Sequence, residues 1–249
     1  MNLLHTLFQI KDRDKNVMPS QEAMALYKEN ISIAWPSTVE GALMSIISSV
    51  DTAMVGTLGT AAIASVGLTS QPRMILLIVA QALCVGTTAI CARRKGAGDQ
   101  RGANSCLNQS LAVVTLLGIL MTVLGYFGAG WLMQLAGANE DTLEMSVSYF
   151  QIISLGMVFN CWSLCICAAM RAIGKTRITM VTNISANLIN VCLNYLLING
   201  HCGFPALGVR GAAIATTCGT IISCFIAIGF ACKKNGYYHL ELPKFDRIT

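Results

Sequence analysis

The chain has 249 residues, of which 54% are hydrophobic and only 12% are charged, and its formal net charge is +5. An ordinary soluble domain carries about twice this share of charged residues, so the composition excludes a soluble domain. It predicts an all-α integral membrane protein that is surrounded by lipid. We interpret the positive charge as a signal of membrane topology and not as a nucleic-acid footprint, and we expect no nucleic-acid partner.

Six apolar runs, each long enough to cross a bilayer as a helix, follow one another with short polar joints between them. They cover residues 31–55, 74–92, 107–135, 147–170, 178–198 and 212–232. We therefore predict three parts: a cytoplasmic N-terminal segment (1–30), a domain of six transmembrane helices (31–232), and a cytoplasmic tail or linker (233–249).

Basic residues are concentrated in alternate joints. Fifteen of the seventeen Lys and Arg residues fall in the N-terminal segment, the second and fourth joints and the tail, which leaves Arg73 and Arg210 for the other side. Because Lys and Arg are retained on the cytoplasmic side, both termini are predicted to be cytoplasmic. We expect a multi-pass protein of the cell (inner, cytoplasmic) membrane.

The first span carries two carboxylates, Glu40 and Asp51, within an apolar segment. An ionised carboxylate at mid-bilayer costs on the order of 2.5 to 3.5 kcal/mol, so it needs a partner, a proton or a water-filled cavity. The two acids are eleven residues apart, which at about 100° per residue returns to nearly the same helix face. We expect this face to be functional; the alternative is that Asp51, near the end of the helix, sits at headgroup level or caps the turn at Gly56. Pro36, earlier in the span, permits a bend.

The fifth span carries four asparagines on one helical face, because their spacings are four, three and four residues. They are Asn183, Asn187, Asn190 and Asn194. Amides that face lipid are costly, so this row should face the interior of the bundle, either for interhelical hydrogen bonding or as a polar site. In the sixth span, small residues at every fourth position from 211 to 227 predict close helix packing, with Thr216 beside them.

Catalytic and metal sites are not expected. The three histidines lie outside the spans, so no intramembrane Ser/His pair or HExxH site can form, and we do not predict an enzyme. Cys161, Cys165 and Cys167 lack a CxxC pair and a neighbouring histidine, which favours a role in packing over a metal site.

Six segments in this order, VDTAMVG, AAIASVGL, GAGD, RAIGKTR, NVCLNYLLING and GVRGAAIATT, resemble the N-terminal half of the multidrug and toxic compound extrusion (MATE) transporters. The resemblance covers residues 31–229. It implies one six-helix lobe of a two-lobe antiporter that exports small organic, often cationic, compounds in exchange for protons or sodium ions. It also implies a second six-helix lobe as partner, which a second copy of the chain could supply because an even number of spans allows parallel insertion.

The resemblance further implies a site for the coupling cation. The aspartate of the family's DT motif corresponds to Asp51, its N-x-x-x-D pattern corresponds to Asn190 and Asn194, and its GAA-x-AT motif places Thr216 nearby. Asn194 stands where many members have aspartate, so one carboxylate remains, which favours a proton over sodium as the coupling ion. No other cofactor is expected. The residues expected to line the substrate cavity are Glu40, Asn160, Asn183 and Asn187.

Two other functions remain open. A flippase for lipid-linked precursors, from the same superfamily, would need a basic cavity, and no base is expected within the spans. The other alternative is a fragment or assembly subunit that transports nothing, because the sequence ends at Thr249, where the second lobe of the family should begin.

Overall fold

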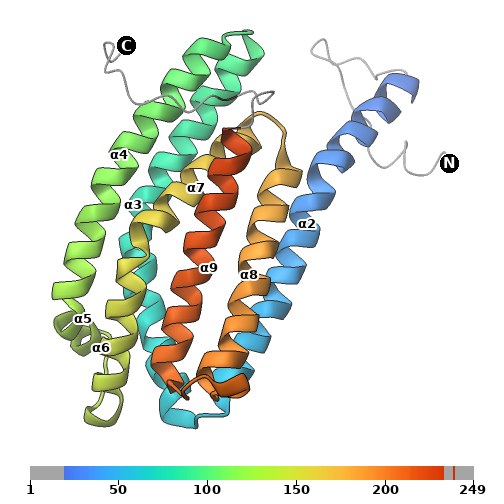
Figure 1. The fold of residues 1–249 in the computed structure, drawn as a ribbon. Coiled ribbons are helices and arrows are strands. Elements are labelled where there is room, and N and C mark those ends of the chain that lie inside the picture. Colours follow the sequence, from blue (N-terminus) through green and yellow to red (C-terminus); the bar gives the residue numbers. More distant parts are fainter. Residues whose placement is uncertain (1–19, 233–237, 239–249) are drawn as a thin grey trace.

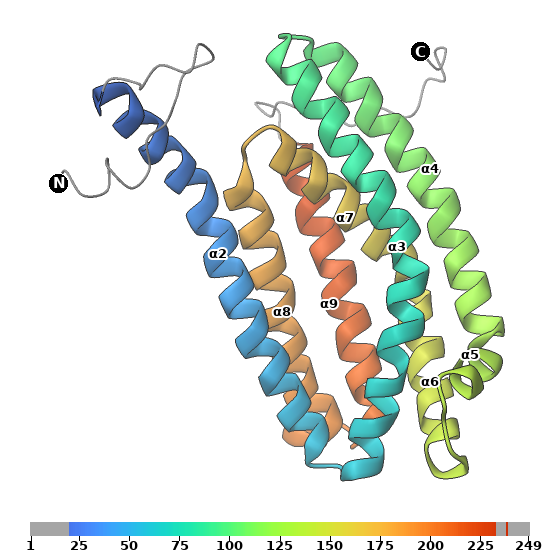
Figure 2. The same ribbon diagram turned by 180° about the vertical axis from the view of Figure 1, so that it is seen from behind.

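The computed structural model describes residues 20–232 and Tyr238, and the regular structure of this part is entirely helical. The elements are α2 (Ser20–Gly56), α3 (Thr60–Gly96), α4 (Gln100–Phe127), α5 (Ala129–Leu135), α6 (Glu140–Leu155), α7 (Met157–Ala172), α8 (Thr176–Ile198), η1 (His201–Gly203) and α9 (Gly208–Ala231). The long helices form one bundle and are connected at its two ends (Figures 1 and 2). The prediction of an all-α fold is confirmed.

Six membrane spans are present when one bent pair of helices is counted as a single span. Within the described residues, five helices are long and apolar enough to cross a bilayer: α2 from Asn30, α3, α4, α8 and α9. The sixth span consists of α6 and α7, which meet at an angle of 52°. Gly156 separates them, and a Cβ at this position would lie 3.1 Å from Thr217 Cγ2 of α9. The fourth predicted span is therefore a broken one, bent where glycine allows close approach to α9.

The first span is longer than its apolar run. α2 begins at Ser20, so the helical segment that precedes residue 31 is continuous with the span. Pro36 lies well inside α2, where its missing N–H interrupts the ladder of helical hydrogen bonds. α2 is thus a long helix with a point at which bending is less costly.

The two turns that carry most of the basic residues within the described part of the chain, α3–α4 and α7–α8, share one end of the bundle (Figure 1). There, the ammonium group of Lys95 at the end of α3 donates a hydrogen bond to the carbonyl of Ile173, which follows α7. At the opposite end, Thr57 Oγ1 donates a hydrogen bond of 3.3 Å to Asn199 Oδ1. This contact joins the ends of α2 and α8. Arg210 belongs to this second end, at the start of α9. The bundle therefore has one strongly basic end.

The prediction that Arg73 lies in a joint, on the side opposite the basic joints, is wrong. Arg73 is inside α3, thirteen positions after Thr60, or roughly 20 Å along the helix. The apolar run begins only after Arg73 because Gln71, Pro72 and Arg73 lower the hydropathy of this stretch, and Pro72 alone would suggest a boundary. The helix nevertheless continues through Pro72, so a basic side chain lies within a membrane-spanning helix.

The short turn between α3 and α4 is closed by Asp99, which caps α4. Asp99 Oδ1 accepts a hydrogen bond of 2.8 Å from the backbone N–H of Gly102, and Arg94 pairs with its other oxygen at 2.9 Å. These two contacts hold the pKa of the Asp99 carboxyl below its usual range.

The main core lies among α3, α4, α7 and the end of α9. Cys161, Cys165 and Cys167 are all buried in it, where thiols pack as small hydrophobes. Tyr238 also belongs to this core: its side chain is fully buried, and its hydroxyl donates to the carbonyl of Ala169 at 3.1 Å.

Small residues allow α9 to approach α8 closely, as predicted. A Cβ at Gly211 would lie 2.5 Å from the carbonyl oxygen of Leu197, and one at Gly219 would lie 3.0 Å from the carbonyl oxygen of Ala186. The polar residues of α8 are therefore held close to Thr216 on α9.

Candidate functional site

α2 and α8 run parallel, with their polar residues in register. Three side-chain contacts between them have the same sequence separation of 143 residues. They join Glu40 to Asn183, Met44 to Asn187, and Asp51 to Asn194. A constant separation requires two helices of the same direction and equal rise, so the asparagine row faces α2 along three turns.

Asp51 is held by two amides of α8. Asn194 Nδ2 donates to Asp51 Oδ1 at 3.0 Å. When the Asn190 amide is oriented to satisfy its neighbours, its nitrogen lies 3.0 Å from Asp51 Oδ2, and its oxygen accepts from the backbone N–H and the hydroxyl of Thr216 at 3.0 and 3.2 Å. The carboxylate is thereby connected through Asn190 to α9.

The opposite orientation of the Asn190 amide suits a protonated carboxyl. Its nitrogen then donates to Thr216 Oγ1 at 3.2 Å but also lies 3.0 Å from the backbone nitrogen of Thr216, another donor, and its oxygen faces Asp51, where only a protonated carboxyl would offer a donor. Asn190 can therefore form hydrogen bonds with either protonation state of Asp51.

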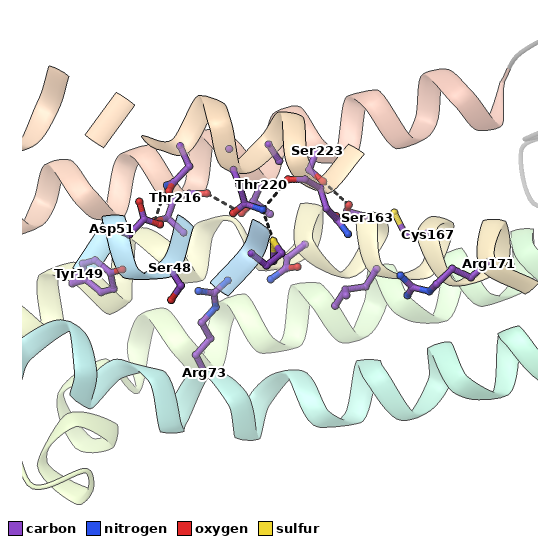
Figure 3. A pocket seen from close by; sticks show the side chains of 18 residues that line it. Ser48, Asp51, Arg73, Tyr149, Ser163, Cys167, Arg171, Thr216, Thr220 and Ser223 are labelled. Carbon is purple, nitrogen blue, oxygen red and sulfur yellow. Dashed lines mark hydrogen bonds between the residues drawn. The ribbon is translucent and has the colours of Figure 1, made fainter. Parts of the chain in front are cut away.

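Asp51 lies between two cavities. The larger cavity, of about 400 Å³, is the central cavity, and it extends from Asp51 to Arg171 near the basic end of the bundle (Figure 3). The smaller one, of about 300 Å³, lies toward the other end and is lined by Val55, Ile63 and Asn194 among others. Ser48, Asp51, Tyr149 and Thr216 line both cavities.

The expected cavity residues lie together, with one exception. Asn160, Asn183 and Asn187 line the central cavity, as do Asn190 and Thr216. Glu40 does not belong to the lining; it lies beside the cavity and accepts a hydrogen bond from Asn183. Asp51 does not cap the end of α2, because its carboxylate contacts α8 instead.

Among the lining residues of the central cavity that the sequence does not indicate are two arginines and a tyrosine, Arg73, Arg171 and Tyr149. Arg171 was counted among the basic residues of a joint, yet it lies in the last turn of α7 and reaches the cavity. The prediction that no basic residue lies within the spans is therefore wrong, because Arg73 lies inside α3. A lone arginine directly before an apolar run was the available signal for it.

Comparison with known proteins identifies relatives of this arrangement. The MatE family model matches residues 36–196. A probable multidrug resistance protein, NorM of Thermotoga maritima, is 31% identical over 216 residues, which cover 86% of this chain and 46% of that protein. The multidrug resistance protein PmpM of Pseudomonas aeruginosa is 28% identical over 196 residues, covering 76% of this chain and 40% of that protein.

Solved structures show the same fold. The outward-facing conformation of a multidrug resistance MATE family transporter matches with a TM-score of 0.80 and 25% identity, covering 89% of this chain and 48% of that one. The chain thus spans about half the length of the relatives that it matches.

Proposed function

The chain belongs to the MatE family, and we propose that it forms one six-helix lobe of a secondary transporter that exports small organic, often cationic, compounds in exchange for protons. The names of the relatives support multidrug efflux. Because those relatives are about twice as long as the matched part, a second six-helix lobe, from a second copy or another chain, would complete the transporter.

The observation that carries this proposal is that Asp51 lines two cavities that extend toward opposite ends of the bundle. A coupling group must exchange its cation with one side of the membrane and then with the other. The position of Asp51 supports such an exchange, because a small movement of α2 relative to α8 would open one cavity and close the other. Pro36 lowers the cost of such a movement.

A proton suits this site better than sodium. A sodium ion loses its hydration shell on binding and is best held by several oxygen ligands with formal negative charge. Asp51 is the only carboxylate among the residues that line the two cavities. One carboxylate suffices for a proton, and Asn190 can adjust its amide to either protonation state. A proton that crosses 100 mV supplies about 2.3 kcal/mol, enough for roughly a 50-fold gradient of a neutral compound.

We propose that the basic end faces the cytoplasm, so that both termini are cytoplasmic. Cysteines introduced at Ala97, in the turn at the basic end, and at Glu140, at the other end, test this orientation. In intact cells, a membrane-impermeant thiol reagent should label position 140 and spare position 97. The reverse pattern would contradict the orientation.

The proposed coupling role is tested with Asp51→Asn, measured as gradient-driven dye efflux from proteoliposomes or cells in an assembly that is active with the wild-type chain. The variant should fold and insert but lose driven efflux. Asp141→Asn, an equal change at the exposed start of α6, should keep it. Wild-type efflux by the Asp51→Asn variant would show that Asp51 is not the coupling group.

One observation favours a second candidate function. The central cavity contains the guanidinium groups of Arg73 and Arg171, and a flippase for lipid-linked precursors needs a basic cavity. Translocation of a lipid-linked precursor in proteoliposomes, without efflux of organic cations, would favour the flippase. The absence of both activities in every assembly would favour a non-transporting subunit.

A further inference from the structure

Arg73 is a basic group inside the lobe. Its Nε atom is buried and, among residues 20–232 and Tyr238, has no hydrogen-bond partner. Within the part of the chain that the structure describes, the one ion pair joins Arg94 to Asp99, so Arg73 pairs with no acid. A charged group in a membrane span is costly unless it is paired or lies in a polar cavity, and such groups are usually functional.

The guanidinium of Arg73 faces the central cavity. Figure 3 shows it reaching from α3 between Asp51 at one end of the cavity and Arg171 at the other. Tyr149 lies near it, and most of the remaining polar lining consists of neutral amides and hydroxyls. The lining therefore holds two guanidinium groups and one carboxylate, so it carries a net positive charge even when Asp51 is ionised.

We propose that Arg73 binds an anionic group, a carboxylate or phosphate, of a zwitterionic amphiphile whose cationic group lies at Asp51. This inference rests on the proposed function in taking the central cavity as the substrate site. A guanidinium matches the two oxygens of such a group with two parallel N–H donors. A cavity of about 400 Å³ is within the range that holds small organic molecules.

A zwitterion satisfies both charged groups of the cavity and still allows exchange for a proton. A simple cation would compete with the proton at Asp51 but would leave Arg73 without an anionic group to bind. A simple anion would bind more tightly when Asp51 is protonated, so proton and substrate would favour each other's binding, which is the opposite of what exchange requires. In a zwitterion, the cationic group competes with the proton at Asp51 while the anionic group remains at Arg73.

A matched pair of dyes tests the proposal. The diamino rhodamine with a free carboxylate is a zwitterion, and its methyl ester keeps the cationic ring system but lacks the carboxylate. Equilibrium binding of each to the purified chain in dodecyl maltoside micelles, which carry neither phosphate nor carboxylate, is measured by fluorescence polarisation. The wild-type chain should prefer the zwitterion by on the order of tenfold, the effect of one charge-assisted hydrogen-bonded contact. Equal binding of the two dyes would overturn the proposal without any variant.

Variants then assign the preference to Arg73. Arg73→Gln should abolish it and leave the affinity for the ester unchanged or improved, and Arg73→Lys should retain part of it. Arg210→Gln removes an equal charge outside the central cavity, where Arg210 contacts Ser148, and should keep the full preference. A preference that survives in Arg73→Gln, with a normal size-exclusion profile, would overturn the assignment.

A further arm identifies the source of the anionic group. Micelles that contain added phosphatidylglycerol supply a competing lipid phosphate, which the sugar-headed detergent alone does not. If this lipid weakens zwitterion binding in the wild type but not in Arg73→Gln, the anion site takes a lipid headgroup; if it has no effect, the site is specific for the free amphiphile. No proton gradient is used, so failure of efflux in the Asp51 experiment leaves this measurement intact.

Discussion

Asn194 on α8 donates a hydrogen bond of 3.0 Å to the carboxylate of Asp51 on α2, and both residues lie near the same end of the bundle. This contact determines the charge of the candidate cation site. The amide of Asn194 is uncharged, so the site carries one negative charge, that of Asp51. An aspartate at position 194 would place a second carboxylate in contact with the first.

Asn194→Asp is therefore expected to create a sodium site. Two carboxylates this close cannot both be ionised without a cation between them, and oxygen ligands with formal charge favour a hard cation. With sodium at ten times its Kd, the variant should gain about 1.4 kcal/mol, or roughly 3–6 °C in apparent unfolding temperature. The measurement is thermal unfolding in sodium chloride against choline chloride of equal concentration.

The wild-type chain and Asn187→Asp serve as controls for this shift. Asn187 faces Met44 and not an acid, so its replacement adds a carboxylate without forming a pair. Neither control should respond to sodium. A sodium response of the wild-type chain equal to that of Asn194→Asp would contradict the preference for a proton.

The sequence predicts the asparagine row well, because a helical period can be read from one segment alone. The period alone cannot predict that Asn194 and not Asn183 lies opposite Asp51, because the register between two helices depends on how they pack; that pairing comes from the resemblance to the MATE family. The same limitation applies to Gly156: a glycine inside an apolar run is common in membrane helices, and only its contact with Thr217 shows why the span bends there. Arg73 was misplaced because hydropathy averages over neighbours, and Pro72 beside it suggests a helix boundary.

Two glycines of α9 should respond in opposite ways to replacement by alanine. A Cβ at Gly211 would meet the backbone of Leu197 at 2.5 Å, and backbone cannot rotate away, so Gly211→Ala should cost about 1–3 kcal/mol. Among the described residues, nothing lies within 4 Å of a Cβ at Gly229, so Gly229→Ala should be neutral or stabilise by up to about 1 kcal/mol through helix propensity. Unfolding by dodecyl sulfate titration in mixed micelles measures both. A neutral Gly211→Ala would contradict the close packing of α8 and α9.

Tyr238 should contribute strongly to stability although it follows the last span. Its side chain is fully buried against the core of α3, α4 and α7, and its hydroxyl donates to Ala169. Tyr238→Ala should cost about 3–5 kcal/mol by leaving a cavity, whereas Tyr238→Phe should cost about 0.5–1.5 kcal/mol by losing the hydrogen bond. Tyr195, which is 52% exposed, provides a control whose replacement by alanine should have a much smaller effect. The same titration in mixed micelles measures all three, and a Tyr238→Ala variant as stable as the wild type would show that this side chain does not anchor the chain to the lobe.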